Sequence, residues 1–200
     1  MQTVPLPEAA PRTRPVSVAE WLLVPEEKGA ELIRGRIVYK AFPSPVHGRT
    51  QRKLGAFVDA FDCRSNEAGR PGGWWLSTEV DLELNGEGVR PDLVGWRRDR
   101  VADLAVADAR GAITERPDWV AEVLSPSTAS RDLGEKMDIY GAAGVSHYWV
   151  ADPANRTLVV YGWTPAGYLR VLAAGAGAVV RAEPFDALGL DVGLLFGDEA

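Results

Sequence analysis

The sequence has a single cysteine, Cys63, and only two histidines in 200 residues. One thiol cannot form an internal disulfide and has no cysteine partner for a metal cluster. The chain also lacks any run of roughly 18 uncharged apolar residues, the length that a membrane-spanning helix needs. Its first residues are proline-rich and polar where a signal peptide would be apolar. We therefore expect a soluble, cytoplasmic protein with no membrane partner.

An excess of positive charge is missing as well. The 22 lysines and arginines are outnumbered by 28 aspartates and glutamates, which gives a formal net charge of -6. The field of the whole molecule does not attract polyanions, and this argues against a general nucleic-acid binder. A nuclease is not excluded, because metal-binding carboxylates add negative charge that bound cations cancel. Local basic segments can still contact phosphates.

Length and composition predict one domain. With 46% hydrophobic residues, a chain of 200 residues can bury one sizeable core. Residues 1–15 carry four prolines and almost no apolar periodicity, which predicts a flexible leader. Residues 16–200 are expected to form a single domain.

The hydrophobic period changes several times along the chain. Period-two or compact apolar runs predict strands over 31–39, 80–84, 89–96, 118–124, 145–151, 157–163 and 168–173. Helical spacing predicts a short helix after a capping box at Ser17, and longer helices over 46–61 and 131–143. In the last of these, Leu133, Met137 and Tyr140 share one face, and Ser127 or Ser130 can cap it. This order predicts an α/β (α+β) fold with a central mixed sheet flanked by helices.

Three ionisable residues lie where the local pattern is apolar or tightly turned. Asp92 follows Pro91 at the start of an apolar run, Glu122 lies inside the strand predicted over 118–124, and Lys136 lies on the next helix. An acid in a buried strand is costly unless it is paired, hydrogen-bonded or bound to a metal. If the two strands are neighbours, the carboxylates of Asp92 and Glu122 converge and need a cation between them.

The chemistry of these groups favours a hard cation. Carboxylate oxygens without a histidine or thiol partner favour Mg²⁺ or Mn²⁺ over zinc. Such a cation can hold a phosphodiester, stabilise charge in the transition state and lower the pKa of a bound water. Lys136 would add a positive group that orients this water or neutralises the phosphate.

Each residue also has a simpler interpretation, and the residues alone leave it open. Asp92 can be a turn residue after proline. Glu122 can be a strand-edge acid that pairs with a surface arginine. Lys136 can form a surface ion pair with Asp132, worth roughly 0.3 to 0.5 kcal/mol.

The motifs of the chain also resemble those of a known family. In order, they are Arg90-Pro-Asp92, Glu122-Val-Leu-Ser-Pro-Ser-Thr128, Arg131-Asp132, Lys136-x-x-x-Tyr140 and Gly144-Val-x-x-Tyr148-Trp149-Val-x-Asp152-Pro153. This pattern resembles the Uma-two family, bacterial proteins of the PD-(D/E)XK nuclease superfamily that are described as restriction-type endonucleases. The resemblance extends from about Glu31, through Ser44-Pro-x-His47, to Pro153.

The resemblance implies a restriction-endonuclease-like αβββαβ core in which Asp92 and Glu122 are the metal ligands, with Mg²⁺ (or Mn²⁺) as cofactor. The superfamily usually has a lysine two residues after the glutamate, and this position is Leu124 here. Lys136 would therefore supply the ammonium group from the helix, as it does in the Uma-two pattern. A lysine side chain is long enough for this reach.

Four further residues are second candidates for the site. Glu31 matches the early glutamate of the family, which would touch the metal through water, although a surface pair with Arg34 is an alternative. His47 matches the family's Ser-Pro-x-His pattern and would contact a phosphate or form a hydrogen bond at the helix start. Arg49 and Lys53, on the same basic helix, would contact the DNA backbone, unless they are only solvated.

These inferences predict a metal-dependent endonuclease that acts on DNA. Cleavage of both strands usually needs two active sites, which a twofold homodimer would provide. One alternative is a catalytically silent binding or regulatory module that keeps the nuclease fold. Another is a hydrolase that uses paired carboxylates without a metal, as glycosidases do.

Overall fold

The computed structural model describes residues 14–104 and 111–199 of the chain. Of the predicted leader, it describes only Arg14 and Pro15, and the guanidinium of Arg14 pairs with Glu20 at 2.5 Å. The rest of the predicted leader lies outside the described residues. Within the described ranges, no helix is both long enough and apolar enough to cross a membrane.

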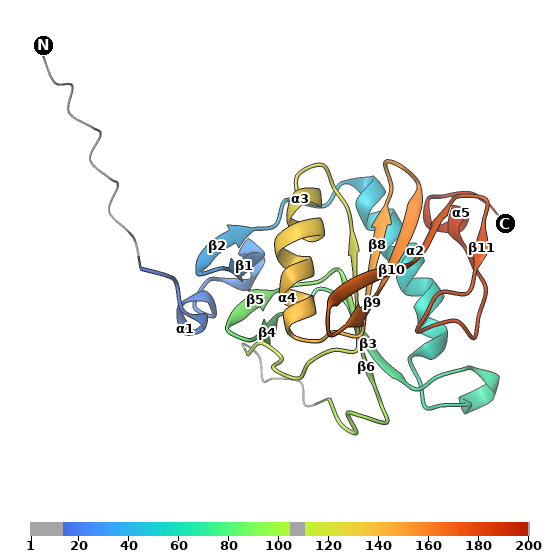
Figure 1. The fold of residues 1–200 in the computed structure, drawn as a ribbon, viewed down its shortest axis with the longest axis horizontal. Coiled ribbons are helices and arrows are strands. Elements are labelled where there is room, and N and C mark those ends of the chain that lie inside the picture. The colour runs from blue at the N-terminus through green and yellow to red at the C-terminus, as the bar shows by residue number, and fades with distance from the viewer. Residues whose placement is uncertain (1–13, 105–110, 200) are drawn as a thin grey trace, which may run out of the picture.

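A six-stranded mixed sheet forms the centre of the fold (Figure 1), with the strand order β10-β9-β8-β7-β6-β3. Strands β7 and β8 run parallel, and every other neighbouring pair is antiparallel. The bounds are β3 Trp74–Ser77, β6 Leu93–Arg97, β7 Trp119–Val123, β8 His147–Asp152, β9 Thr157–Thr164 and β10 Gly167–Gly175. The parallel pair requires a crossover, and the segment that connects β7 to β8 supplies a helix for it.

The structure also has a second, four-stranded sheet, which the sequence pattern did not separate from the first. Its order is β2-β1-β5-β4, with β1 Ala30–Ile33, β2 Arg36–Tyr39, β4 Leu82–Leu84 and β5 Glu87–Val89. A third pair joins β11 Val179–Val180 to β12 Leu190–Asp191. The strand predicted over 89–96 is divided at Pro91, which has no backbone N–H for a sheet ladder, so β5 belongs to one sheet and β6 to the other.

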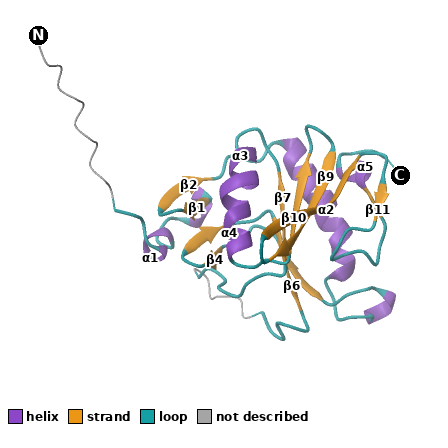
Figure 2. Cartoon of the chain, in the orientation of Figure 1, coloured by secondary structure: helices purple, strands orange, loops and turns teal. Residues whose placement is uncertain are grey.

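Helices cover both faces of the central sheet (Figure 2). The central sheet is covered by α2 Pro45–Val58, α3 Ala129–Arg131, α4 Met137–Ala142 and α5 Val192–Leu195. Helix α1 Val18–Trp21 packs against β1 of the second sheet instead. Short 3-10 turns lie at Glu26–Lys28, Asp59–Phe61 and Glu67–Gly69. Leu54 of α2 packs with Ala121 of β7, whereas Tyr140 of α4 packs with Val120. Successive side chains of a strand point to opposite faces, so α2 and α4 lie on opposite sides of β7.

The crossover helix differs from its prediction in two ways. It begins at Ala129 after Thr128, so neither Ser127 nor Ser130 caps it, and the hydroxyl of Ser127 lies 3.0 Å from that of Ser125 instead. Between α3 and α4, residues Asp132–Lys136 form a π-helical turn, which is wider than an α-helical turn. Leu133 is consequently 45% exposed, although Tyr140 on the predicted shared face is fully buried.

The predicted fold class is confirmed. The protein is an α+β fold in which a six-stranded mixed sheet is flanked by helices. The C-terminal segment completes the core beside α2, where the ring of Phe185 packs edge-on against Trp119 at a centroid distance of 4.9 Å. On the α4 side, the apolar face of the sheet is interrupted by the buried acid Glu122, two residues after Val120 in β7.

Candidate active site

Asp92 and Glu122 come together on neighbouring strands. In the antiparallel pair β6–β7, Leu93 lies opposite Ala121, so the next residues outward are Asp92 and Glu122. The Oδ2 atom of Asp92 accepts a hydrogen bond from the backbone N–H of Val123 at 2.8 Å. The two carboxylates that the sequence singled out therefore lie at the same end of adjacent strands.

Asp92 is buried between Lys40 and His47. Its Oδ1 atom lies 2.8 Å from Nζ of Lys40, and its Oδ2 atom lies 3.4 Å from Nε2 of His47. Burial alone would raise the pKa of Asp92, but the His47 hydrogen bond and the charge of Lys40 hold that pKa well below its usual range. Asp92 is thus not a solvated turn residue. It is a buried, ionised carboxylate.

Glu122 has a different environment from that of Asp92. Its Oε1 atom accepts a hydrogen bond from the hydroxyl of Tyr140 at 2.7 Å and lies 2.5 Å from Nζ of Lys136. Burial raises the pKa of Glu122 to about 8, and the charge of Lys136 opposes this rise. No surface arginine pairs with Glu122 among the described residues, so the strand-edge interpretation is wrong.

Lys136 lies at the centre of a group of acids. Its side chain is 1% exposed, and Nζ lies 2.5 Å from Glu122, 3.0 Å from Glu31 and 3.8 Å from Asp132. Burial would lower the pKa of Lys136, but these carboxylates together raise it well above its usual value. The ammonium group is therefore charged in the folded protein. A surface pair with Asp132 alone does not describe this residue.

Glu31 in β1 holds the opposite side of Lys136. It is fully buried, and its Oε1 atom also accepts a hydrogen bond from the backbone N–H of Arg90 at 3.0 Å. Among the described residues its Oε2 atom has no hydrogen-bond partner, and Nε of Arg131 is 3.7 Å away. The surface pair with Arg34 does not form, because Arg34 pairs with Asp138.

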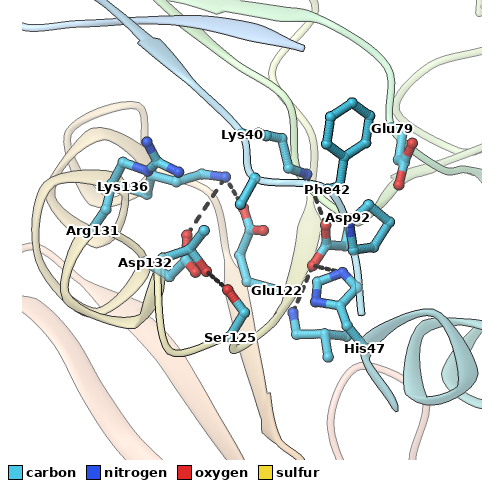
Figure 3. A pocket seen from close by; sticks show the side chains of 14 residues that line it. Lys40, Phe42, His47, Glu79, Asp92, Glu122, Ser125, Arg131, Asp132 and Lys136 are labelled. Carbon is cyan, nitrogen blue, oxygen red and sulfur yellow. Dashed lines mark hydrogen bonds and ion pairs between the residues drawn. The ribbon is translucent and has the colours of Figure 1, made fainter. Parts of the chain in front are cut away.

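Most of these side chains, but not Glu31 or Tyr140, line a small polar cavity of about 40 Å³ (Figure 3). One water needs roughly 10 to 15 Å³ of such space, so a few waters or a hydrated ion would fit. The residues that line the cavity with charged, polar or aromatic side chains are Lys40, Phe42, His47, Glu79, Asp92, Glu122, Ser125, Thr128, Arg131, Asp132 and Lys136.

The donors at this cavity suit Mg²⁺ or Mn²⁺. Nowhere in residues 14–104 and 111–199 do three or more His, Cys, Asp or Glu side chains form a cluster that could hold a metal. Asp92 and Glu122 supply two carboxylates, and Mg²⁺ is usually bound by one or two carboxylates with waters and substrate phosphates completing its shell. The two carboxylates match the ligands of an oxygen-bound ion, and His47, which also lines the cavity, already contacts Asp92.

The predicted contacts on helix α2 divide between two faces. His47, whose backbone N–H is capped by the hydroxyl of Ser44, turns its ring toward Asp92. Arg49 instead donates to the backbone carbonyl of Gly197 at 3.3 Å, and neither Arg49 nor Lys53 lines the cavity. A DNA contact by Arg49 and Lys53 stays a prediction, at a surface outside the cavity.

Three residues at the site had no assigned role in the sequence. Lys40 follows β2 and binds Asp92 across a sequence separation of 52 residues, which no local pattern reveals. Asp132 lines the cavity from the π turn. The sequence could have placed Tyr140 at the site, because it stands four residues after Lys136 and residues at that spacing lie on one helix face.

The mixed sheet with paired acids at one end of adjacent strands defines a protein with a nuclease-like fold. Residues 18–193 match the Uma2 family model, which is described as "Putative restriction endonuclease". The chain therefore belongs to the Uma2 family.

A solved structure supports the assignment of the fold. It is a crystal structure from Anabaena variabilis described as a "putative nuclease belonging to DUF820", with a TM-score of 0.70 and 21% sequence identity. The similarity covers 91% of this chain and 98% of that chain. At this identity it shows that the two chains share a fold. No curated protein matches the sequence.

Proposed function

We propose that the protein is a Mg²⁺-dependent endonuclease that hydrolyses phosphodiester bonds of DNA. One observation carries the proposal: Asp92 and Glu122 meet at one cavity, and the ammonium group of Lys136 lies 2.5 Å from Glu122. Membership of a family described as restriction endonucleases supports the same reaction class.

Asp92 and Glu122 are the residues that would hold the metal. When bound, Mg²⁺ or Mn²⁺ would lower the pKa of a water and offset the negative charge of the phosphate. Lys40 contacts an oxygen of Asp92 and lowers the pKa of this acid, whereas Lys136 contacts Glu122 and opposes the rise of its pKa that burial causes. The lysines thereby reduce the cost of burying two like charges together.

The remaining residues position these groups. Lys136 is charged, so it acts on the phosphate as a cation and does not accept a proton as a base. Tyr140 orients Glu122 through its hydroxyl, and Glu31 holds Lys136 from the opposite side. Glu31 was expected to reach the metal through water, and its contact with Lys136 supports a positioning role instead.

DNA is the proposed substrate because of the family and the phosphate chemistry of the site. In this proposal His47 orients Asp92, whereas Arg49 and Lys53 contact phosphates away from the cleaved bond. A DNA substrate is also consistent with the cytoplasmic location expected from the sequence. A homodimer would supply the second active site for duplex cleavage. Analytical ultracentrifugation tests this, and a clear monomer at micromolar concentration would argue against the dimer.

Cleavage of supercoiled plasmid DNA tests the proposed reaction. We expect nicking or linearisation with Mg²⁺ or Mn²⁺, none with EDTA, and none for Glu122→Gln, which keeps the size of the side chain but loses the charge. Asp99→Asn is the matched control, because Asp99 lies on the surface in a pair with Arg97. Activity that survives EDTA would favour a metal-free hydrolase. A folded protein without cleavage or metal binding would favour the catalytically silent module.

A further inference from the structure

Phe42 projects from the protein at the mouth of the cavity. Its ring is 97% exposed, although it belongs to the segment that lines the site (Figure 3). The segment is anchored on both sides. Before it, Lys40 binds Asp92, and after it, Ser44 caps helix α2. The ring is thus held beside the site.

The fold gains nothing from this ring. Full burial of a phenylalanine side chain stabilises a protein by roughly 1.5 to 3 kcal/mol, and Phe42 forgoes this contribution. The two neighbours in the segment, Ala41 and Pro43, are exposed as well. A binding partner, and not the core, is therefore the natural place for the contact surface of Phe42.

Charged groups of both signs line the cavity. Lys40, Arg131 and Lys136 lie inside it beside buried acids, and a phosphate there would be attracted to these three cations. Glu79 lines the same cavity but is exposed and acidic, so it repels a phosphate. The side of the cavity that offers the Glu79 carboxylate and the Phe42 ring suits a neutral, flat group with N–H donors. A nucleobase has these properties.

We infer that Phe42 is a stacking platform for an unpaired nucleobase next to the phosphate that is cleaved. This inference rests on the proposed function, and it specifies the substrate class. In a duplex both faces of a base are already stacked, so an exposed ring gains a contact only when the base is unpaired or extruded. The preferred substrate is consequently single-stranded DNA, or duplex DNA with an unpaired base.

A protein partner does not fit this surface as well. Stable protein–protein interfaces typically bury about 800 Å² on each side and have an apolar centre. Here the large apolar side chains that are exposed on and beside the segment are Tyr39, Phe42 and Val46, and the cavity beside them is lined mostly by charged groups. Stacking on a base needs only the one ring.

Binding without metal tests the inference separately from cleavage. Fluorescence anisotropy in EDTA would compare a fluorescein-labelled single-stranded oligonucleotide with the same sequence as a perfect duplex. Phe42→Ala is expected to weaken single-strand binding roughly 5- to 150-fold, the loss that corresponds to one base stacked on an aromatic ring. Phe42→Trp should bind like the wild type, and duplex binding should change little. Val179→Ala is the control, because Val179 is 70% exposed and lies on β11.

Three binding results would overturn the inference. They are wild-type protein that does not bind the single strand, a Phe42→Ala variant that binds it unchanged, and equal losses for single strand and duplex. A change of oligomeric state in Phe42→Ala would also overturn it, by showing that the ring contacts protein. Binding through Phe42 without any cleavage by the wild type would refute only the proposed hydrolysis. Cleavage with unchanged binding by Phe42→Ala would refute only the stacking.

Discussion

Lys136 and Glu122 form a fully buried ion pair, with Nζ of the lysine 2.5 Å from Oε1 of the glutamate. The lysine comes from the π turn and the glutamate from β7, so the pair joins the crossover helix to the central sheet. Glu31 of the second sheet contacts the same ammonium group. A single cation therefore connects three elements of the fold at the cavity.

Loss of this cation should destabilise the protein strongly. In Lys136→Met, Glu122 and Glu31 keep their buried positions without their nearest positive charge. We expect the free energy of unfolding to fall by roughly 3 to 5 kcal/mol, as is typical when one partner of a buried ion pair is removed. Urea denaturation followed by tryptophan fluorescence measures this change.

The double variant Lys136→Met/Glu122→Gln is the control for this prediction. It removes one of the two unpaired acids, Glu122, together with the lysine, so it should be more stable than Lys136→Met alone. The effects of residues in direct contact are not additive. Strictly additive losses would contradict an ion pair between these two residues.

Mn²⁺ binding should depend on the carboxylate of Asp92. Asp92→Asn keeps the size and the acceptor oxygen for Val123 but loses the charge. We expect a loss of Mn²⁺ affinity beyond the roughly 10- to 100-fold that changes outside the metal's ligands usually cause. Electron paramagnetic resonance of free Mn²⁺ measures it, with the exposed Asp99→Asn as the reference. Equal affinities in the two variants would remove Asp92 from the metal site.

Two buried tyrosines provide a matched pair that tests the orientation of Glu122. The hydroxyl of Tyr140 donates to Glu122 at 2.7 Å, whereas that of Tyr148 donates to the backbone carbonyl of Asp132 at 2.9 Å. Each Tyr→Phe change should cost about 1 kcal/mol of stability. Only Tyr140→Phe should also weaken Mn²⁺ binding, roughly 10- to 100-fold, because it frees a ligand to rotate. A similar loss of affinity in Tyr148→Phe would show that the effect is general loosening of the core.

The sequence singled out Asp92 and Glu122 because each lies where the local pattern is apolar or tightly turned. Glu122 lies between apolar neighbours in a strand, and this position already demands a partner. The partner Lys40 could not be found in this way, because its contact with Asp92 depends on how the second sheet packs against the first. Alternation indicates that a segment is a strand, but it does not indicate which strand lies beside it.

The crossover helix shows a second limit of the sequence pattern. A regular α-helix would place Leu133 on the buried face with Tyr140, and the apolar spacing favoured that arrangement. The π turn changes the rotation between these two residues, so Leu133 faces solvent while Asp132 and Lys136 face the cavity. Such turns are frequent at functional sites. Here the π turn gives up the regular packing of an α-helix and places polar side chains at the cavity instead.

His147 should make the stability of the protein sensitive to acid. Burial lowers the pKa of His147 from 6.5, although the nearby acids Glu183 and Asp118 oppose this. The unfolded chain therefore binds this proton more tightly than the folded protein, and stability present above pH 6.5 is lost as the pH falls below it. His147→Gln removes the titration, so urea denaturation across this range should show a smaller loss for the variant than for the wild type. Parallel stability curves would show that His147 titrates alike in both states.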